Sequence, residues 1–308
     1  MKPSPSRTAS ELATQPDCWR RAAALAPSAG ELPRPGERVA VTGCGTSWFM
    51  AQSYAALREA AGQGETDAFA ASQFPVGRRY DRVLAITRSG TTTEVLTLLE
   101  RLRDSGTRTV AITADATAPV RRAAGSAVVL DWADEESVVQ TRFATTALAL
   151  LRAGLEGHGA LPEAVGPVAA AADEADAALT DPIPPAVLEA EQWTFLGLGW
   201  AYGLAQEAAL KMREAAGAWT EAYPAMEYRH GPVAIAAPGR VVWAFGPLPE
   251  GLAADVVGAG GTLVQVGADP LADLVRAQRV AVAVAEGRGL NPDTPRNLTR
   301  SVVLPEGT

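Results

Sequence analysis

Cysteine and histidine are scarce in this sequence, which has two of each among its 308 residues: Cys18, Cys44, His158 and His230. None of the four has the spacing of a zinc site, so neither a structural metal nor a disulfide framework is expected. No apolar run reaches the roughly 18 residues that a membrane span needs. The net charge of −8 comes without a basic stripe, which argues against a nucleic-acid partner.

The first residues, MKPSPSRTAS, include a lysine but no apolar stretch behind it. We therefore expect no secretory signal and take a cytoplasmic location as the default. Apolar residues make up 47% of the chain and charged residues 20%, which is an ordinary globular composition. The length allows two modest domains or one large one.

Short apolar runs alternate with longer helical patterns along the chain. This alternation is typical of parallel strands joined by crossover helices. The runs in the first half are RVAVTG, RVLAIT, TRTVAITA and SAVVLD, with helices expected from about residues 47 and 92 and over 138–155. A Gly-, Pro- and Ala-rich connection with one amphipathic helix leads to the second half, where the runs are WTFLGLG, GRVVWAFG, GTLVQVG and RVAVAVAEG. A helix is expected to end near residue 217, and the last 21 residues are expected to form a Pro-rich tail.

The chain also repeats itself. TGCGTSWFMAQ at 42–52 recurs as LGLGWAYGLAQ at 196–206, and REAAG at 58–62 recurs at 213–217, shifted by one position. Chance agreement is the alternative in an alanine-rich chain, but the order of the matches favours a duplicated α/β unit. The second copy lacks the two hydroxyls of the first.

Hydroxyl side chains gather at two helix starts. A glycine turn after a parallel strand directs backbone N–H groups outward, where the helix dipole favours an anion, and Thr46 and Ser47 add hydroxyls there. The alternative is a plain turn capped by Ser47. The stretch TRSGTTTE at 87–94 follows the next strand and is also rich in hydroxyls. Together the two turns predict a crevice for a phosphate monoester, and the absence of a Walker lysine and of Gly-x-Gly-x-x-Gly spacing argues against a nucleotide.

Six motifs in order, CGTS, TRSGTTTE, ESVVQT, EAALKMRE, EYRHGP and PRNLTRS, resemble the sugar isomerase (SIS) family. The resemblance is to the isomerase part of glucosamine-6-phosphate synthase and to aminosugar-phosphate deaminases. It implies an α/β fold with two tandem SIS domains, each a five-stranded parallel sheet flanked by helices, in a homodimer. The implied divisions are a helical lead (1–30), a phosphate-binding domain (31–158), a linker helix (159–190) and a second domain with the tail (191–308).

The resemblance also implies which residues bind the substrate. Ser47, Ser89 and Thr92 match the phosphate-binding hydroxyls, whereas Val139 and Thr141 match a loop that contacts the sugar. Arg88 would place a positive charge near the phosphate or point to solvent. The full expected set is Cys44, Gly45, Thr46, Ser47, Thr87, Arg88, Ser89, Gly90, Thr92, Val139, Thr141, Thr299 and Arg300. No metal or organic cofactor is expected.

Three residues are candidates for catalysis. Lys211 and Glu214 share one helix face, and a solvated charge pair, helped by Glu207, is the alternative. The resemblance implies that Glu214 moves a proton between C1 and C2 of the opened sugar with the help of Lys211. It also implies that His230 opens the ring from the neighbouring subunit. His158 is expected to be a surface residue.

One position departs from the family pattern. Arg300 stands where the synthases and many deaminases carry a lysine, and arginine, which stays protonated, cannot form an imine with a keto sugar. The glutaminase domain of the synthase has no counterpart in the sequence. The expected activity is therefore an aminosugar-phosphate isomerase or deaminase acting on a hexosamine 6-phosphate. The alternatives are a fructosamine-phosphate deglycase and a non-catalytic phosphosugar sensor, although no helix-turn-helix domain or basic arm supports a transcriptional sensor.

Overall fold

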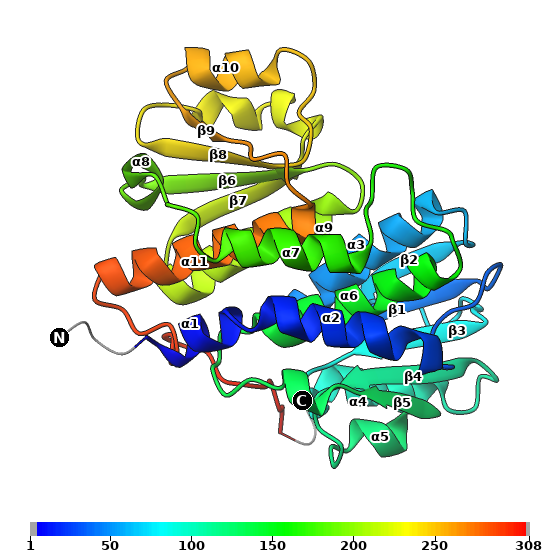
Figure 1. The fold of residues 1–308 in the computed structure, drawn as a ribbon. Coiled ribbons are helices and arrows are strands. Elements are labelled where there is room, and N and C mark those ends of the chain that lie inside the picture. Colours follow the sequence, from blue (N-terminus) through cyan, green and yellow to red (C-terminus); the bar gives the residue numbers. More distant parts are fainter. Residues whose placement is uncertain (1–4, 306–308) are drawn as a thin grey trace. The chain divides into compact units, whose positions relative to one another are not determined.

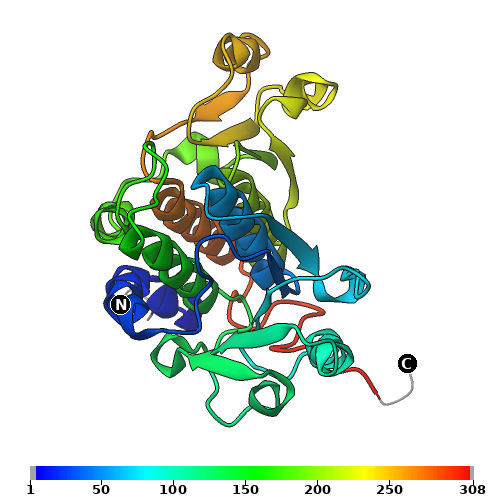
Figure 2. The same ribbon diagram turned by 90° about the vertical axis from the view of Figure 1, so that its right-hand side faces the viewer.

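The computed structural model describes residues 5–305, so the expected lead (1–30) and second domain (191–308) each extend slightly beyond the described part. The chain divides into two compact units (Figure 1, Figure 2). Unit 1 contains the residues up to 16, 137–141 and 170–298, and unit 2 contains 17–136, 142–169 and the residues from 299 onward.

Unit 2 is built on a five-stranded parallel sheet in the order β2-β1-β3-β4-β5 (Figure 1). Its strands are β1 (Val39–Gly43), β2 (Thr66–Ala70), β3 (Arg82–Ile86), β4 (Arg108–Thr113) and β5 (Ser126–Val129). Its helices are α3 (Thr46–Ala60), α4 (Thr93–Leu102), α5 (Val120–Ala123) and α6 (Arg142–Gly157), and most of α2 (Gln15–Leu25) belongs to it. The predicted strands of the first half are confirmed, as are the helix starts near residues 47 and 92.

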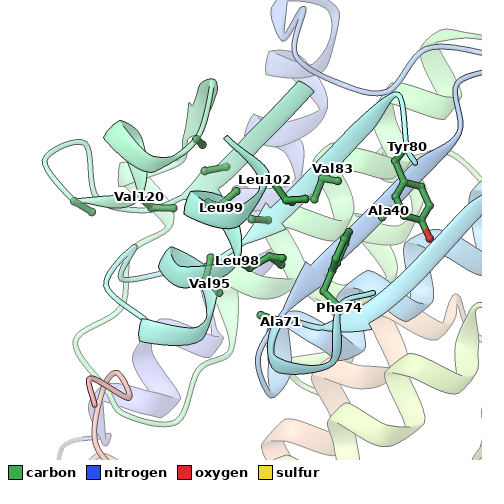
Figure 3. Close-up of a cluster of buried hydrophobic side chains, with 14 residues drawn as sticks. Ala40, Ala71, Phe74, Tyr80, Val83, Val95, Leu98, Leu99, Leu102 and Val120 are labelled. Carbon is green, nitrogen blue, oxygen red and sulfur yellow. The ribbon is translucent and has the colours of Figure 1, made fainter. Parts of the chain in front are cut away.

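The core of unit 2 shows why the sheet can be read from the sequence. Every residue of β1 and β3 is buried, and both strands are mostly apolar, apart from Thr42 in β1 and Arg82 at the start of β3. Helix α4 places Val95, Leu98, Leu99 and Leu102 on one face, and they pack against the sheet (Figure 3). This spacing of three and four residues is the one that a helix with a single buried face requires.

Unit 1 contains a four-stranded parallel sheet in the order β7-β6-β8-β9. Its strands are β6 (Gln192–Gly197), β7 (Trp219–Pro224), β8 (Arg240–Phe245) and β9 (Thr262–Val264). Its helices are α1 (Arg7–Leu12), α8 (Pro185–Leu188), α9 (Ala201–Ala216), α10 (Leu252–Gly258) and α11 (Pro270–Gly287), together with most of α7 (Val168–Ala178). The expectation of five strands in the second sheet is wrong for the described residues.

The run RVAVAVAEG at 279–287, predicted as a strand, is the end of helix α11. Asp269 caps the amino end of the helix, because its side chain accepts a hydrogen bond from the N–H of Leu271 at 2.9 Å. Pro270, the first residue of the helix, suits this position as well. Most of its side chains are buried, so its apolar residues do not show a helical period. A short apolar run of this kind does not distinguish a buried helix from a buried strand.

The two sheets share their connection order: in each, the first strand lies between the second and the third, and the fourth lies outside the third. The turns after β1 and β6 also match, since Gly45 has φ 54° and Gly199 has φ 53°. The arginines that begin the two REAAG copies also make matching hydrogen bonds. Arg58 donates to the hydroxyl of Thr66 at 2.7 Å, and Arg213 donates to that of Thr220 at 3.1 Å.

A buried carboxyl group in unit 1 predicts how stability depends on pH. Burial raises the pKa of Asp273 to about 6, although Trp243 donates a hydrogen bond to it at 2.9 Å and Arg276 lies nearby. A raised pKa means that the folded state favours the protonated acid, so this stabilisation is lost as the pH rises from about 4 through about 6. We expect Asp273→Asn to increase the free energy of unfolding by roughly 2–3 kcal/mol at pH 8 and by little at pH 4.

Urea unfolding at both pH values measures this effect, with the exposed Asp104→Asn as the control. Equal gains at pH 4 and pH 8 would show that the charge of Asp273 is not the cause.

Candidate functional site

The turn between β1 and α3 carries the first group of hydroxyls. A Cβ atom added to Gly43 would lie 2.6 Å from the Cβ of Ser47 and 2.9 Å from the carbonyl oxygen of Ile86, at the end of β3. Only glycine fits this close approach. The turn is thus packed against the end of the neighbouring strand, with Thr46 and Ser47 in the first turn of α3.

The thiol of Cys44 lies in this turn. Burial, reinforced by the negative charge of Glu94, raises the pKa of the Cys44 thiol to about 11. A thiol with such a pKa stays protonated near neutral pH. The Cys44 side chain packs against the apolar core of unit 2.

The second turn, between β3 and α4, contains a cluster of three hydroxyls. The Ser89 and Thr91 hydroxyl oxygens lie 2.9 Å apart, and the hydroxyl of Ser301 lies 3.0 Å from the first and 2.9 Å from the second. Thr92 begins α4 without capping the helix with its side chain. Gly90 has φ 62°, and a Cβ there would lie 2.5 Å from the Cβ of Ala118.

Thr87 and Arg88 join the second turn to the sheet. The Thr87 hydroxyl is buried and has no hydrogen-bond partner among residues 5–305. Such a group is costly to bury unless something bonds to it. Arg88 does not point to solvent, because it is buried and donates to the carbonyl oxygen of Arg300 at 3.0 Å.

The tail is fastened to this region of unit 2 through Arg300. The Arg300 guanidinium donates to both carboxylate oxygens of Asp134, at 2.6 and 2.7 Å, and to the carbonyl oxygen of Glu135 at 3.1 Å. The Thr299 hydroxyl donates to the carbonyl oxygen of Ser301 at 2.9 Å. Arg300 is thus held by a carboxylate, and its neighbour Ser301 reaches the hydroxyl cluster.

The loop expected to contact the sugar belongs to unit 1. Its residues Val139 and Thr141 are buried. The loop is anchored at Ser137, whose hydroxyl donates to the carboxylate of Glu11, and at Val138, whose N–H donates to the carbonyl oxygen of Asp293 at 3.3 Å. These two hydrogen bonds join the loop to other segments of unit 1.

Helix α9 of unit 1 carries a buried cation between two carboxylates. The Lys211 ammonium lies 3.3 Å from Glu207 and 2.5 Å from Glu214, and the Lys211 and Glu207 side chains are each 1% exposed. The Glu214 side chain is 19% exposed. The alternative of a solvated charge pair is therefore wrong.

The electrostatics of Lys211 decide its chemistry. Burial favours the neutral amine, but the charges of Glu207 and Glu214 outweigh burial and raise the pKa of Lys211 above its usual value. The amine stays protonated, so it is not available to form an imine. Lys211 is also the single lysine among residues 5–305.

The two histidines lie at the surface. His230 follows a short 3₁₀ helix (Glu227–Arg229), and its imidazole makes no hydrogen bond or ion pair with another residue in 5–305. His158 is exposed after α6, as expected. Three residues were not among the expected site residues, Glu207, Asp134 and Ser301. The sequence did contain a signal for each: Glu207 lies four residues before Lys211, Asp134 belongs to an acidic run, and Ser301 is a hydroxyl residue next to Arg300.

Residues 5–305 contain no group of three or more histidine, cysteine or carboxylate side chains placed to hold a metal ion. In the same part of the chain, no helix combines the length and the apolar character that crossing a membrane requires.

Residues 34–153 match the family model of the SIS domain. The chain is similar to two glutamine–fructose-6-phosphate aminotransferases (isomerizing). It is 26% identical to that of Sulfurisphaera tokodaii, with 87% of this chain and 50% of the relative covered. It is 28% identical to that of Methanothermobacter thermautotrophicus, with 93% and 54% covered. The chain thus spans about half the length of these curated relatives.

Solved structures share the fold over nearly the whole chain. Glucosamine-6-phosphate deaminase from Thermotoga maritima superimposes with a TM-score of 0.82 and 24% identity, covering 97% of this chain and 100% of that one. Tagatose-6-phosphate ketose/aldose isomerase from Escherichia coli superimposes with a TM-score of 0.75 and 18% identity, covering 98% and 97%. At these identities the likeness concerns the fold.

Proposed function

We propose that the chain is an aminosugar-phosphate isomerase or deaminase that acts on a hexosamine 6-phosphate without a metal or organic cofactor. The observation that carries the proposal is the buried Glu207–Lys211–Glu214 cluster of α9, in which Glu214 alone is partly exposed. A charged cluster of this kind is costly to bury and is characteristic of sites that move protons. The names of the similar proteins, an aminotransferase, a deaminase and a ketose/aldose isomerase, support the same class of reaction.

In this mechanism His230 assists opening of the sugar ring, and Glu214 takes the proton from C2 of the open aldose. The carboxyl proton of the partly exposed Glu214 exchanges with water, and Glu214 then delivers a proton to C1, which converts the resulting enolamine into an imine at C2. Water then hydrolyses the imine to a ketose phosphate and ammonia. One carboxylate can serve both steps because it alternates between base and acid. Lys211, protonated throughout, positions Glu214 by their ion pair.

The proposed substrate phosphate binds to the hydroxyls of the two turns of unit 2, those of Ser47, Ser89 and Thr92. Gly45, Gly90 and the start of α3 add backbone N–H groups, which suit an anion. The buried hydroxyl of Thr87, which has no hydrogen-bond partner among residues 5–305, supports a polar ligand at the carboxyl ends of the strands. The neighbouring Arg88 guanidinium lies 3.9 Å from the buried carboxylate of Glu135.

We also propose that unit 1 is a diverged second SIS domain. The shared strand order and the matching glycine turns support this assignment. In this assignment the proposed phosphate-binding hydroxyls belong to the first copy and Glu214 belongs to the second. A homodimer in which His230 serves the neighbouring subunit, and a cytoplasmic location, belong to the same proposal.

The test is to incubate the protein with a panel of aminosugar and fructosamine phosphates and to follow the release of ammonia and ketose. Ammonia from a hexosamine 6-phosphate supports the proposal. Release of an amino acid from a fructosamine phosphate would instead show the second candidate, a deglycase. That candidate is favoured by Arg300, which stands where an imine-forming lysine is expected and is held by Asp134. Tight binding without turnover of any compound would show a phosphosugar sensor.

The phosphate site gives a quantitative prediction. Ser89→Ala removes one hydroxyl from the proposed anion site, and we expect it to weaken binding of the phosphosugar by about 1.5–3 kcal/mol, the contribution of a hydrogen bond to a charged group. Titration calorimetry measures this loss. Ser105→Ala, which removes a hydroxyl near the other end of α4, is the control. Unchanged affinity in Ser89→Ala would place the phosphate elsewhere.

The role of Arg300 gives a second prediction. Because Lys211 stays protonated and Arg300 cannot form an imine, borohydride reduction in the presence of a keto-sugar phosphate is expected to leave residues 5–305 unmodified. Peptide mass spectrometry detects the adduct. Arg300→Lys is the positive control, since it restores an amine at this position. An adduct on Lys211 in the natural protein would overturn the assigned role of this lysine.

A further inference from the structure

Unit 2 has a hollow at the amino ends of its strands. The hollow has a volume of about 360 Å³ and is lined by the first residues of β3, β4 and β5, namely Arg82, Arg108 and Ser126. Arg103, Arg122 and Glu31 complete the charged part of its wall. The turns with Ser47 and Ser89 follow the carboxyl ends of the strands, so the hollow lies one strand length away, on the order of 15–20 Å.

The charges in the hollow are not balanced. Arg82 is buried and paired with Glu37, with two contacts of 2.9 Å, and the Glu31 carboxylate accepts a hydrogen bond from Ser126 at 2.6 Å. By contrast, three exposed guanidinium groups have no hydrogen-bond or ion-pair partner among residues 5–305. They belong to Arg103, Arg108 and Arg122.

Three like charges around one hollow repel one another unless an anion neutralises them. Their gathering stands out in a chain whose net charge is −8. Helix ends explain the positions of two of these arginines. Arg103 caps the carboxyl end of α4 and Arg122 lies in the last turn of α5, where the helix dipole favours a cation. Arg108 is the first residue of strand β4, so a helix dipole does not explain its position.

We propose that this hollow binds a small molecule that carries two or three linked phosphates. Each guanidinium is a planar fork that can hold a phosphate with two parallel hydrogen bonds. Three separate forks match a chain of phosphates better than a single phosphate, and the volume is in the range of small-molecule sites. The inference is independent of the proposed function, since it uses no residue of the substrate turns or of α9.

Free polyphosphate and a nucleoside triphosphate carry the same linked phosphates, and the test separates the two. Binding of sodium tripolyphosphate and of ATP is measured by titration calorimetry at low salt with the natural chain. The same titrations use two double variants. The hollow variant is Arg103→Ser/Arg108→Ser, and the matched control is Arg79→Ser/Arg101→Ser, which removes the same charge from exposed positions that do not line the hollow.

We expect one tripolyphosphate per chain, bound at least about tenfold more weakly by the hollow variant than by the natural chain. The control is expected to stay within about twofold. Equal affinity for ATP means that the polyphosphate is recognised alone, and higher affinity means that the nucleoside also contributes. Melting temperatures of the two variants within a degree or two of each other show that both are folded.

Four results would overturn the proposal. Unchanged affinity in the hollow variant would show that these arginines bind nothing. An equal loss in the control would show a general effect of net charge. Loss of binding in Ser89→Ala, with the arginines intact, would place the anion at the substrate turns. A short DNA duplex bound more tightly than tripolyphosphate would point to a nucleic-acid surface and would equally contradict a small-molecule site.

Discussion

Replacing Glu214 by glutamine is expected to lower kcat by about 10²–10⁴ while the substrate still binds with nearly unchanged affinity. Glutamine keeps the shape of the side chain and its ability to form hydrogen bonds, but it cannot accept a proton from carbon. The partly exposed position of Glu214, beside the buried Lys211, is what a group needs to reach a substrate and remain oriented. Steady-state kinetics and a binding titration measure the two quantities separately.

Glu191→Gln is the matched control, because it removes an exposed carboxylate from the same unit. The control is expected to keep full turnover. If Glu214→Gln retained full turnover as well, the carbon acid–base role would have to be assigned to another residue.

Replacing Lys211 by methionine is expected to lower the free energy of unfolding by about 3–5 kcal/mol. The reason is that the carboxylate of Glu207, which is 1% exposed, would remain buried without its cation. Methionine fills a similar volume, so a cavity contributes little. Urea unfolding at pH 7 measures the loss.

The double variant Lys211→Met/Glu207→Gln separates charge from packing. It should recover a large part of the lost stability, because it removes the uncompensated charge as well. A double variant as unstable as the single one would show that Lys211 contributes by packing rather than by its charge.

The central strands of both sheets could be predicted from the sequence because they are buried on both faces. Val39–Val41 of β1 and Val83–Ile86 of β3 are short apolar runs, and a turn follows each strand. The edge strands β2 and β7 were not predicted, since their sequences TDAFA and WTEAYP mix polar and apolar residues and most of these are only half-buried. Edge strands of this kind lack the apolar run that reveals a central strand.

The site was predictable where its residues are close in sequence. The hydroxyls around Gly90 and the spacing of Lys211 and Glu214 are local patterns, and a strand followed by a helix fixes where they lie. The partners of these residues were not predictable in the same way. Ser301 meets Ser89, and Asp134 holds Arg300, across separations of 212 and 166 residues. Such contacts depend on the path of the tail over unit 2.

The burial of the charged residues of α9 could not be predicted from their spacing either. Glu207, Lys211 and Glu214 share one side of α9, but the sequence does not say whether this side faces solvent. Alanines at Ala205, Ala208 and Ala209 allow close packing of the helix, and both Glu207 and Lys211 are buried with them. The change from a solvated pair to a buried cluster follows from this packing.

Exchange of a carbon-bound hydrogen with solvent tests the central claim most directly. The natural protein and Glu214→Gln are incubated with glucosamine 6-phosphate in heavy water, and deuterium at C1 and C2 of the sugar is followed by NMR. The predicted result is deuterium incorporation by the natural protein and loss of at least about 10² in its rate in the variant. Incorporation at the same rate in both, or binding without incorporation by the natural protein, would contradict proton transfer by Glu214.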